Sequence, residues 1–552
     1  MDEKQKKLLQ DLLSSDAKGA GFVKRLFFAH FDSGAISPYP SGDDPDTECF
    51  ISNLQDFIEK EIDAAAIDRA AKIPDSVVAG LSRLGVMAMT VPKEYGGLGM
   101  SQRAYCKATE TLAKTCASTA LFVNVHQSIG LKGLVLFGTE EQKQKWLPQM
   151  ASGQAIGAFS LTEPCAGSDA AAIQCLAEYD PEKKVYRLNG VKQWSTNASF
   201  AKVLTVMART DDGITAFLVN PDMKGFEVTH PALEKVGMRG TWTANLKFTD
   251  MEVPEENILG QKGKGLKVAL SVLDYGRTTF GAMCTGIAKD LLQRSIAHAT
   301  DRKQFRAPLA SFGMVKKKLA RMAALVFAMD AAVYLTADLI DKGTEDIMLE
   351  SAILKVFASD ALWEIIYETM QIFGGRSFFT DAPFERNMRD ARLNQIGEGS
   401  NEVMRAFIAV VGLRDVGLLF KGLWDSGSYA ELGKRLFAFA ALPSGPRGSD
   451  EARQFCRSLR RFGRSCFHLL VRNGEKVVDA QLELERIANG AISLYTTAAV
   501  LSKLEIDQTN KDAAYHYCRM ALASLNKNLD ALFSPEDEKI YALSQRLVQE
   551  GF

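Results

Sequence analysis

Apolar residues recur every three or four positions through the first part of the chain, and this spacing predicts amphipathic helices. The pattern is clear in FISNLQDFIEKEI, IPDSVVAGLSRLGV and EEQKQKWLPQM. Loops such as SPYPSGDDPD and VPKEYGGLGM separate the helices, because proline and glycine interrupt helical runs. We therefore predict an N-terminal extension over residues 1–45 and an α-helical domain over residues 46–156.

The spacing changes between residues 157 and 262. Short segments rich in β-branched residues follow one another there, namely KVYRLNG, KVLTVMART, GITAFLV and NLKFTDMEV. Asn-Gly, Asp-Asp-Gly and Pro-Asp sequences separate them, and such pairs are typical of hairpin turns. These features predict a middle domain made of antiparallel β-strands.

Long helices return over residues 263–415. One stripe alternates steps of four and three, as expected for a helix packed lengthwise in a four-helix bundle; its residues are Leu266, Leu270, Leu273, Arg277, Phe280, Cys284, Ile287 and Leu291. An additional helical domain is expected over residues 425–552, near the loop ALPSGPRGSD. Helices, then strands, then helices predict an α+β multidomain fold and not βαβ repeats.

Composition excludes several classes of function. The 552 residues have a formal net charge of −1, so no basic field indicates nucleic-acid binding. The nine cysteines form no Cys-x-x-Cys pair and the six histidines do not cluster, which argues against a metal site and favours reduced thiols. The most apolar stretch, residues 319–340, carries Arg321 and Asp330, so we expect no transmembrane segment.

The N-terminus, MDEKQKK, lacks the features of a secretory or transit signal. We expect a cytoplasmic location in a bacterium, or the mitochondrial matrix or inner membrane for a processed eukaryotic protein.

Glu398 stands between two glycines in IGEGSNEVMR, just before an apolar run. Gly397 and Gly399 leave the carboxylate free of neighbouring side chains, which suits a group that must approach a substrate carbon. The N-terminus of the following helix favours the ionised form, whereas burial raises the pKa of a carboxyl group. We expect burial to dominate once a substrate excludes water.

Arg277 lies on the apolar stripe, where an unpaired guanidinium would cost several kcal/mol to desolvate. It either extends to solvent or meets an anion, which could be a carboxylate or a phosphate or carbonyl group of a ligand. GQKGKG at residues 260–265 is better interpreted as a turn between domains than as a dinucleotide motif, because no βαβ unit surrounds it.

Two polar segments flank the start of the β domain. AFSLTEPCAGSDAA brings Thr162, Gly167 and Ser168 together, and their donors could hold an anionic or carbonyl-rich ligand. KQWSTN places Trp194 beside two hydroxyl groups, which suits a flat ring that forms hydrogen bonds. Each segment alone is more often structural.

In combination, the motifs LTEPCAGSD, WSTN, DRKQF, QIFGG and EGSN resemble the acyl-CoA dehydrogenase flavoprotein family over residues 45–412. SPYP, HQSIGLKG, LFGTEEQKQKWLP and the additional C-terminal region resemble its very-long-chain subgroup. The resemblance implies FAD, a CoA-thioester substrate, desaturation to the trans-2-enoyl-CoA in fatty acid β-oxidation, an electron-transferring flavoprotein as acceptor, and a homodimer.

The resemblance also implies roles for individual residues. Glu398 would be the base that removes the α proton, while the β hydrogen leaves as hydride to flavin N5. The residues implied for the flavin and pyrophosphate are Phe159, Leu161, Thr162, Gly167, Ser168, Trp194 and Thr196, with Ser400 and Glu402 on the other side of the base. Those implied for the FAD of the neighbouring subunit are Arg302, Gln304, Phe305, Gln371, Gly374 and Gly375. Those implied for the substrate are Ser168, Asp274, Arg277 and Gly399.

The chain departs from the family pattern at Ser195, Ser377 and Glu402, without losing a catalytic group. Ala120 and Asn124 fall near positions where the long-chain subgroup has glycines at the base of the acyl pocket, with Phe122 between them. A bulkier floor would shorten or bend that pocket, so medium-chain and very-long-chain substrates both remain open.

The segment 451–470 combines an apolar stripe with five arginines, a composition that suits contact with an anionic membrane surface. The alternative is a helix docked on its own subunit. At the level of function, a non-catalytic assembly protein on the same fold and an oxidase remain as alternatives to the dehydrogenase.

Overall fold

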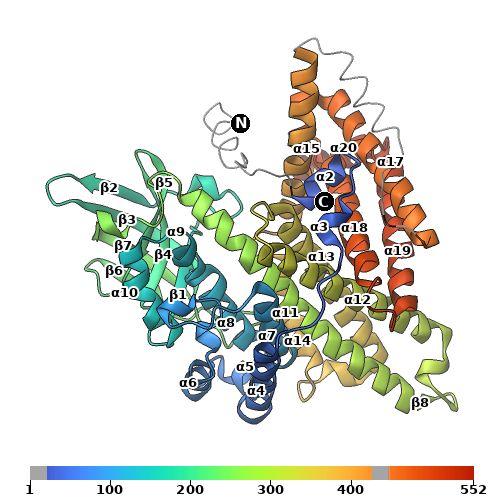
Figure 1. Ribbon diagram of the computed structural model, residues 1–552, viewed down its shortest axis with the longest axis horizontal. Helices are drawn as coiled ribbons and strands as arrows, with labels where there is room; N and C mark the ends of the chain where they lie inside the picture. The colour runs from blue at the N-terminus through green and yellow to red at the C-terminus, as the bar shows by residue number, and fades with distance from the viewer. Residues whose placement is uncertain (1–20, 426–445, 447, 552) are drawn as a thin grey trace.

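The computed structural model describes residues 21–425, 446 and 448–551. In Figure 1 the β domain lies on one side, the C-terminal helices on the other, and α11 runs between them. The N-terminal helices are α2 (Phe22–Phe27), α3 (Ser33–Ile36), α4 (Pro45–Glu61), α5 (Ala64–Ala70), α6 (Asp75–Arg83), α7 (Gln102–Thr115), α8 (Ala117–Asn124), α9 (Lys132–Phe137) and α10 (Glu140–Ala151).

Polar residues begin several of these helices. Asp44 accepts a hydrogen bond from the backbone N–H of Thr47 and starts α4, with Pro45 in the first turn. Thr139 and Gln142 form a reciprocal capping box at the start of α10. Between α8 and α9 the chain forms one π-helical turn, Val125–Gly130, which contains the HQSIG sequence.

The middle domain is one curled sheet in the order β1-β4-β2-β3-β7-β6, with β5 paired to β4. Its strands are β1 (Gly157–Ser160), β2 (Leu176–Asp180), β3 (Val185–Thr196), β4 (Val203–Thr210), β5 (Gly213–Val219), β6 (Phe226–His230) and β7 (Thr243–Pro254). Most pairings are antiparallel, as predicted, and β4 also runs parallel to β1 and β2.

The turn predicted at Asn189-Gly190 is wrong. These residues lie inside β3, which continues from KVYRLNG through to WST. Gly190 has a φ of +154°, and the register with β7 shifts at this point, so the pair lies opposite a bulge in β7 and not in a hairpin turn. Trp194 and Thr196 therefore lie at the end of β3, whose first half pairs with β2.

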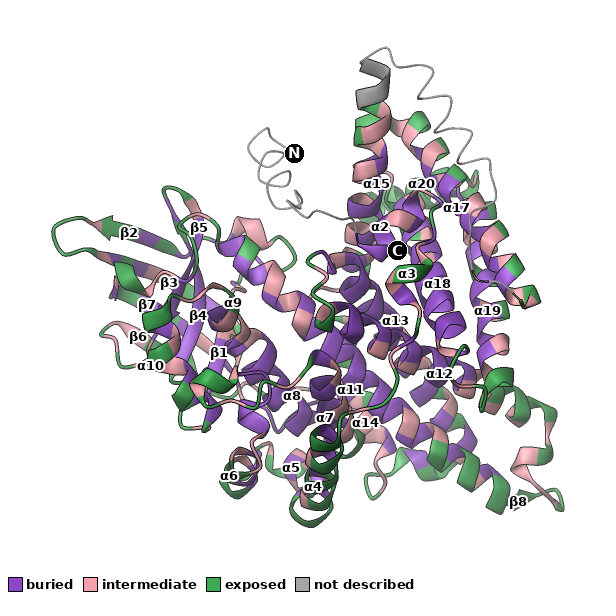
Figure 2. Cartoon of the chain, in the orientation of Figure 1, coloured by how far each residue is buried: buried purple, intermediate pink, exposed green. Residues whose placement is uncertain are grey.

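The bundle is built from α11 (Gly265–Asp301), α12 (Gly313–Asp341), α13 (Met348–Phe373), α14 (Phe384–Arg392) and α15 (Asn401–Asp425). GQKGKG forms the turn before α11, and Gly260 and Gly263 both have positive φ there. A short hairpin of β8 (Lys303–Gln304) and β9 (Ala307–Pro308) joins α11 to α12. Figure 2 shows that burial is concentrated where α11, α13 and α18 lie together.

The C-terminal helices extend this core and do not form a separate body. They are α17 (Asp450–Asn473), α18 (Gln481–Lys503), α19 (Lys511–Asp530) and α20 (Glu536–Glu550). The Tyr495 hydroxyl of α18 and the Thr336 hydroxyl of α12 are hydrogen-bonded at 2.7 Å. The N-terminal helix α2 also packs here, because the ring of Phe27 lies edge-on to that of Phe462 at 5.1 Å.

The proposed membrane face of segment 451–470 is wrong. The residues of its apolar stripe are all buried in the core of this chain, namely Phe455, Leu459, Phe462, Cys466 and Leu469. Arg453 and Arg461 form ion pairs with Asp450 and Asp530. This helix therefore docks on its own subunit, the alternative that the sequence left open.

Two stretches are long and apolar enough to span a bilayer, Ala117–Phe137 and Gly313–Asp341. Both are mostly buried inside the fold, which makes them weak evidence for a membrane span.

Candidate active site

Glu398 lies in the loop that leads into α15. Its own φ is +57°, a left-handed conformation that a residue with a side chain rarely adopts. Gly399 has a φ of +93°, and a Cβ added there would lie 2.7 Å from Cε of Met404. The backbone conformation therefore favours glycine at position 399, in addition to the open access expected from the sequence. Strained residues of this kind cluster at functional sites.

The Glu398 carboxylate is buried beside a bare stretch of α11. A Cβ added to Gly276 would lie 3.3 Å from Oε2 of Glu398 and 3.4 Å from Oγ of Ser128. Among the described residues, Oε2 has no hydrogen-bond partner. Burial raises the pKa of Glu398 to about 7, and the positive charges of Arg277 and Lys355 only partly oppose the rise. Burial dominates, as expected.

Arg277 does not extend to solvent. Its side chain is buried, with Nη1 3.3 Å from Oδ1 of Asp274 and Nε donating to the backbone oxygen of Glu398 at 3.4 Å. Ser351 also donates to Asp274, at 2.8 Å. Burial raises the pKa of Asp274 to about 6, and Arg277 opposes this shift. The anion that Arg277 required is thus a carboxylate one turn away on the same helix.

Lys355 of α13 was not identified from the sequence. Its Nζ donates to the backbone oxygen of Gly399 at 2.7 Å and to Oδ1 of Asn401 at 2.8 Å. Asn401 in turn donates to Asp360 at 2.8 Å. The available signal was a single lysine inside the apolar run ESAILKVFASDALWEII, which is rare in a buried helix unless the charge has partners.

A second group of predicted residues meets at the ends of β1 and β3. The backbone N–H of Gln193 donates to the oxygen of Thr162 at 2.9 Å, and the hydroxyls of Ser160 and Ser195 lie 2.6 Å apart. The structure therefore brings two groups together: Phe159, Leu161, Thr162, Gly167 and Ser168 on one side, and Trp194 and Thr196 on the other.

A buried ion pair supports this junction. Lys192 Nζ lies 2.7 Å from Oε1 of Glu163 and donates to the backbone oxygen of Leu161 at 2.9 Å. Glu163 also accepts hydrogen bonds from the backbone N–H groups of Gln174 and Cys175. Both charged side chains are almost fully buried, and their contacts fix the loop after β1 against β3.

The exposed face of this junction fits a flat, polar ring system. Trp194 is 63% exposed although it is one of the largest apolar side chains, and its φ of +59° turns it out of the strand at a bulge. Thr196 and Thr243 place their hydroxyl oxygens 3.3 Å apart beside it. An aromatic surface next to hydroxyl groups and the polar loop at Ser168 suits the ring and diphosphate of FAD.

The other residues predicted for the cofactor lie elsewhere. Arg302, Gln304 and Phe305 follow the far end of α11, a helix about 55 Å long, whose other end adjoins the β domain. The stacked rings of His298 and Phe373, 4.1 Å apart, bring the ends of α11 and α13 together, so the residues at the end of α13 (Gln371, Gly374 and Gly375) lie near this end too. Figure 1 shows β8 at the opposite side of the molecule from the β sheet. One chain cannot use both groups for the same cofactor.

Near Glu398, Ser400 accepts a hydrogen bond from the backbone N–H of Val403 at 3.4 Å and begins α15, and Glu402 is exposed on the first turn. Across the described residues no group of three or more potential metal ligands is present.

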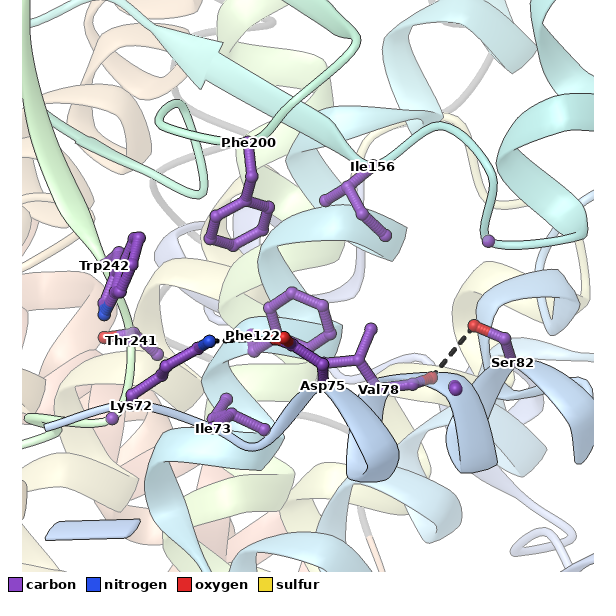
Figure 3. Close-up of a pocket in the computed structure, with 13 residues that line it drawn as sticks. Lys72, Ile73, Asp75, Val78, Ser82, Phe122, Ile156, Phe200, Thr241 and Trp242 are labelled. Atoms are coloured by element: carbon purple, nitrogen blue, oxygen red, sulfur yellow. Dashed lines mark hydrogen bonds and ion pairs between the residues drawn. The ribbon is translucent and has the colours of Figure 1, made fainter. Parts of the chain in front are cut away.

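The two faces of α8 have different surroundings. Asn124 faces α7 and α11, where Tyr105 donates to its Oδ1 at 2.8 Å. Phe122 faces the other way and lines a separate pocket of about 430 Å³ between α6 and the β domain, together with Phe200 and Trp242 (Figure 3). Phe122 therefore does not share the face of α8 that carries Asn124.

Four family models match consecutive parts of the chain. The acyl-CoA dehydrogenase N-terminal, middle and C-terminal domains match residues 44–154, 158–251 and 263–413. The ACAD9/ACADV C-terminal domain matches residues 446–551.

Known proteins and a solved structure agree with these matches. The very long-chain specific acyl-CoA dehydrogenase of Bos taurus, named as mitochondrial, is 34% identical over 96% of this chain and 88% of its own. The probable acyl-CoA dehydrogenase FadE10 of Mycobacterium tuberculosis is 33% identical over 97% of this chain and 89% of its own. An acyl-CoA dehydrogenase complexed with FAD from Bacillus anthracis superimposes with a TM-score of 0.80, at 27% identity, covering 92% of both chains. The chain belongs to the acyl-CoA dehydrogenase family.

Proposed function

We propose that Glu398 is the base that removes the α proton of an acyl-CoA in the FAD-dependent dehydrogenation that this family performs. The observation that carries the proposal is the buried, unpartnered Oε2 of Glu398, held over the bare backbone of Gly276. A pKa near 7 gives this carboxylate useful proton affinity at neutral pH, which an ordinary exposed glutamate lacks. Both hydrogen bonds from Lys355 and the contact of Arg277 fix the loop without occupying Oε2.

The cofactor residues divide between two sites. Phe159, Leu161, Thr162, Gly167, Ser168, Trp194 and Thr196 would hold the flavin and the adjacent phosphates in the same chain. FAD, when bound, supplies the hydride acceptor. Ser400 and Glu402 would approach it from the side of the base, while Ser168, Asp274, Arg277 and Gly399 would contact or orient the thioester.

The second site supports a homodimer. Phe305 is 91% exposed and Phe378 is 80% exposed, and with Phe379, Met314 and Tyr367 they make an apolar surface at the far end of the bundle. Exposed apolar patches of this kind mark interaction surfaces. A second copy would cover this surface and receive Arg302, Gln304, Phe305, Gln371, Gly374 and Gly375 at its own FAD.

An electron-transferring flavoprotein is the acceptor expected for such an enzyme, and the substrate range extends from medium to very long acyl chains. We place the protein in a bacterial cytoplasm or a mitochondrial matrix, where its nine free cysteines stay reduced.

The test is a Glu398→Gln variant loaded with FAD. Adding acyl-CoA without oxygen bleaches the flavin of the wild type, and the variant should bleach it roughly 10²–10⁴-fold more slowly while retaining the cofactor. Glu59→Gln, on the exposed face of α4, is the matched control and should behave as wild type. Bleaching of the Glu398→Gln protein within tenfold of the wild-type rate would refute the role of Glu398.

A further inference from the structure

A group of polar side chains lies deep between α7, α8 and α11, beyond the catalytic carboxylate. Tyr105, Asn124, Ser128 and Thr279 are all buried. Tyr105 and Thr279 both donate hydrogen bonds to Oδ1 of Asn124. The Oγ of Ser128 donates to the backbone oxygen of Asn124 at 2.6 Å.

The amide nitrogen of Asn124 is the exception in this group. Nδ2 is fully buried and has no hydrogen-bond partner among the described residues. Burial holds the pKa of Tyr105 well above its ordinary value, so its hydroxyl keeps its proton and must donate it. The nearest acceptor is Oδ1 at 2.8 Å, compared with 3.5 Å for the backbone oxygen of Asn124. With Oδ1 accepting from both hydroxyl groups, Nδ2 is a donor without an acceptor among the described residues.

An orphaned buried donor is costly, by about 1–3 kcal/mol, and most buried polar groups in proteins are satisfied. Such an exception marks the place of a bound water, an ion or a ligand atom. The partner of Nδ2 must supply an oxygen or nitrogen that accepts a hydrogen bond.

The amide lies about one helical turn from the backbone of Gly276, beside which Glu398 Oε2 and Ser128 Oγ lie. Ser128 Oγ and Glu398 Oε2 both lie within 3.4 Å of the position that a Cβ on Gly276 would occupy. Thr279 is three residues from Gly276 on α11, and Asn124 is four residues from Ser128 on the neighbouring segment. Each separation corresponds to about 5 Å along a helix axis. An extended chain advances roughly 1.2 Å per bond, so this distance corresponds to about four carbons.

We propose that the preferred acyl group carries a hydroxyl or oxo oxygen between about its fifth and eighth carbon, and that Asn124 recognises this oxygen through Nδ2. This inference rests on the proposed function, because it places the thioester at Glu398. The oxygen is neutral rather than a carboxylate, since the residues around the amide, Tyr105, Ser128 and Thr279, are neutral donors and acceptors. A buried carboxylate there would lack a cation.

The test compares matched substrates on the FAD-loaded full-length protein. The probes are octanoyl-CoA and octanoyl-CoAs that carry one hydroxyl at carbon 5, 6, 7 or 8. For one of the hydroxylated probes we expect a kcat/KM tenfold to a hundredfold above that of octanoyl-CoA, because only that probe satisfies the amide. Equal values for all probes, or a preference for octanoyl-CoA, would overturn the proposal.

Variants identify the recognising residue. Asn124→Leu removes the donor and should reduce the preference for the hydroxylated probe to less than threefold, while octanoyl-CoA remains a substrate. Phe122→Leu changes the opposite face of the same helix and should leave the preference unchanged. If Asn124→Leu does not fold, the wild-type substrate ratio alone decides.

The same experiment separates the two proposals. If no acyl-CoA bleaches the wild-type flavin, the proposed function fails and the specificity with it. If octanoyl-CoA bleaches the flavin as well as every hydroxylated probe does, the function holds and only the inference about Asn124 fails.

Discussion

Lys355 donates a hydrogen bond of 2.7 Å to the backbone oxygen of Gly399, the residue that follows the candidate base. The ammonium group is fully buried, and burial lowers its pKa to about 8, although the negative charge of Glu398 partly offsets this shift. A cation within the bundle thus holds the left-handed loop on which Glu398 depends. Its charge also opposes the rise in the pKa of Glu398.

Replacing Lys355 with methionine should lower kcat/KM about 10–100-fold, because the loop loses its anchor and small misplacements of a base are costly. If Lys355 only anchored the loop, its replacement would leave the pH dependence of kcat/KM unchanged. Loss of the positive charge should raise the pKa seen in kcat/KM above about 7, since Lys355 stabilises the ionised form of Glu398. Lys421→Met, which removes an exposed ion pair with Glu475, is the control. An unchanged pH dependence of kcat/KM in Lys355→Met would contradict the claim that Lys355 stabilises the ionised form of Glu398.

Glu398→Gln should be more stable than the wild type at pH 8. The folded pKa of about 7 exceeds the ordinary value of 4.5, so folding favours the protonated form. The wild type therefore has its full stability below pH 4.5 and loses it as the pH rises through 7. At pH 8 the difference is about 3 kcal/mol, or roughly 2–3 °C in Tm for a chain of this length.

The gain should shrink to less than about half at pH 5, where the buried carboxyl is already protonated in the folded state. Thermal unfolding at both pH values, with Glu59→Gln as the exposed control, checks the prediction. A gain that does not depend on pH would show that Glu398 is not the group responsible.

Periodicity predicted the helical parts well because packing follows the apolar stripe. Phe280, Cys284 and Ile287 of the predicted stripe are buried in α11. The β domain was harder, since the Asn189-Gly190 pair indicates a hairpin but here continues a long strand opposite a bulge in β7. The backbone hydrogen bonds between β3 and β7 along the whole strand outweigh the local turn preference of these two residues.

The site was only partly predictable. Glu398 and the loops around Thr162 and Trp194 can be selected as candidates from the sequence because their motifs are local. Lys355 and Asn124 act across helices far apart in sequence, so no local pattern identifies their partners. For the same reason the stripe of α17 could suggest a membrane surface, because the chain that covers it includes Phe27, more than 400 residues earlier.

Lys192→Met should weaken FAD binding. Without its ammonium group the buried Glu163 keeps two backbone donors but loses its counter-charge, and the oxygen of Leu161 loses a hydrogen bond. Breaking a buried pair in this way costs about 3–5 kcal/mol. We expect a lower flavin-to-protein ratio after gel filtration and a lower Tm. Lys183→Met, in an exposed pair with Glu252 of the same sheet, should retain the flavin.

Phe305→Asp should separate the proposed dimer and, with it, reduce the flavin content. The ring is 91% exposed in the single chain and touches Phe312 edge-on at 6.1 Å, so its replacement removes little from the core of this chain. A carboxylate placed in an apolar interface is costly to desolvate, so association should weaken more than tenfold. Light scattering gives the oligomeric state and absorbance gives the bound FAD.

The matched control is Val471→Asp, an apolar position on α17 that is 68% exposed, which should leave both readouts unchanged. A Phe305→Asp protein that stays dimeric with full FAD would contradict the shared site. A monomer that keeps all its FAD would separate the two claims, because the interface would then be real while the residues at the end of α11 would not reach the partner's cofactor.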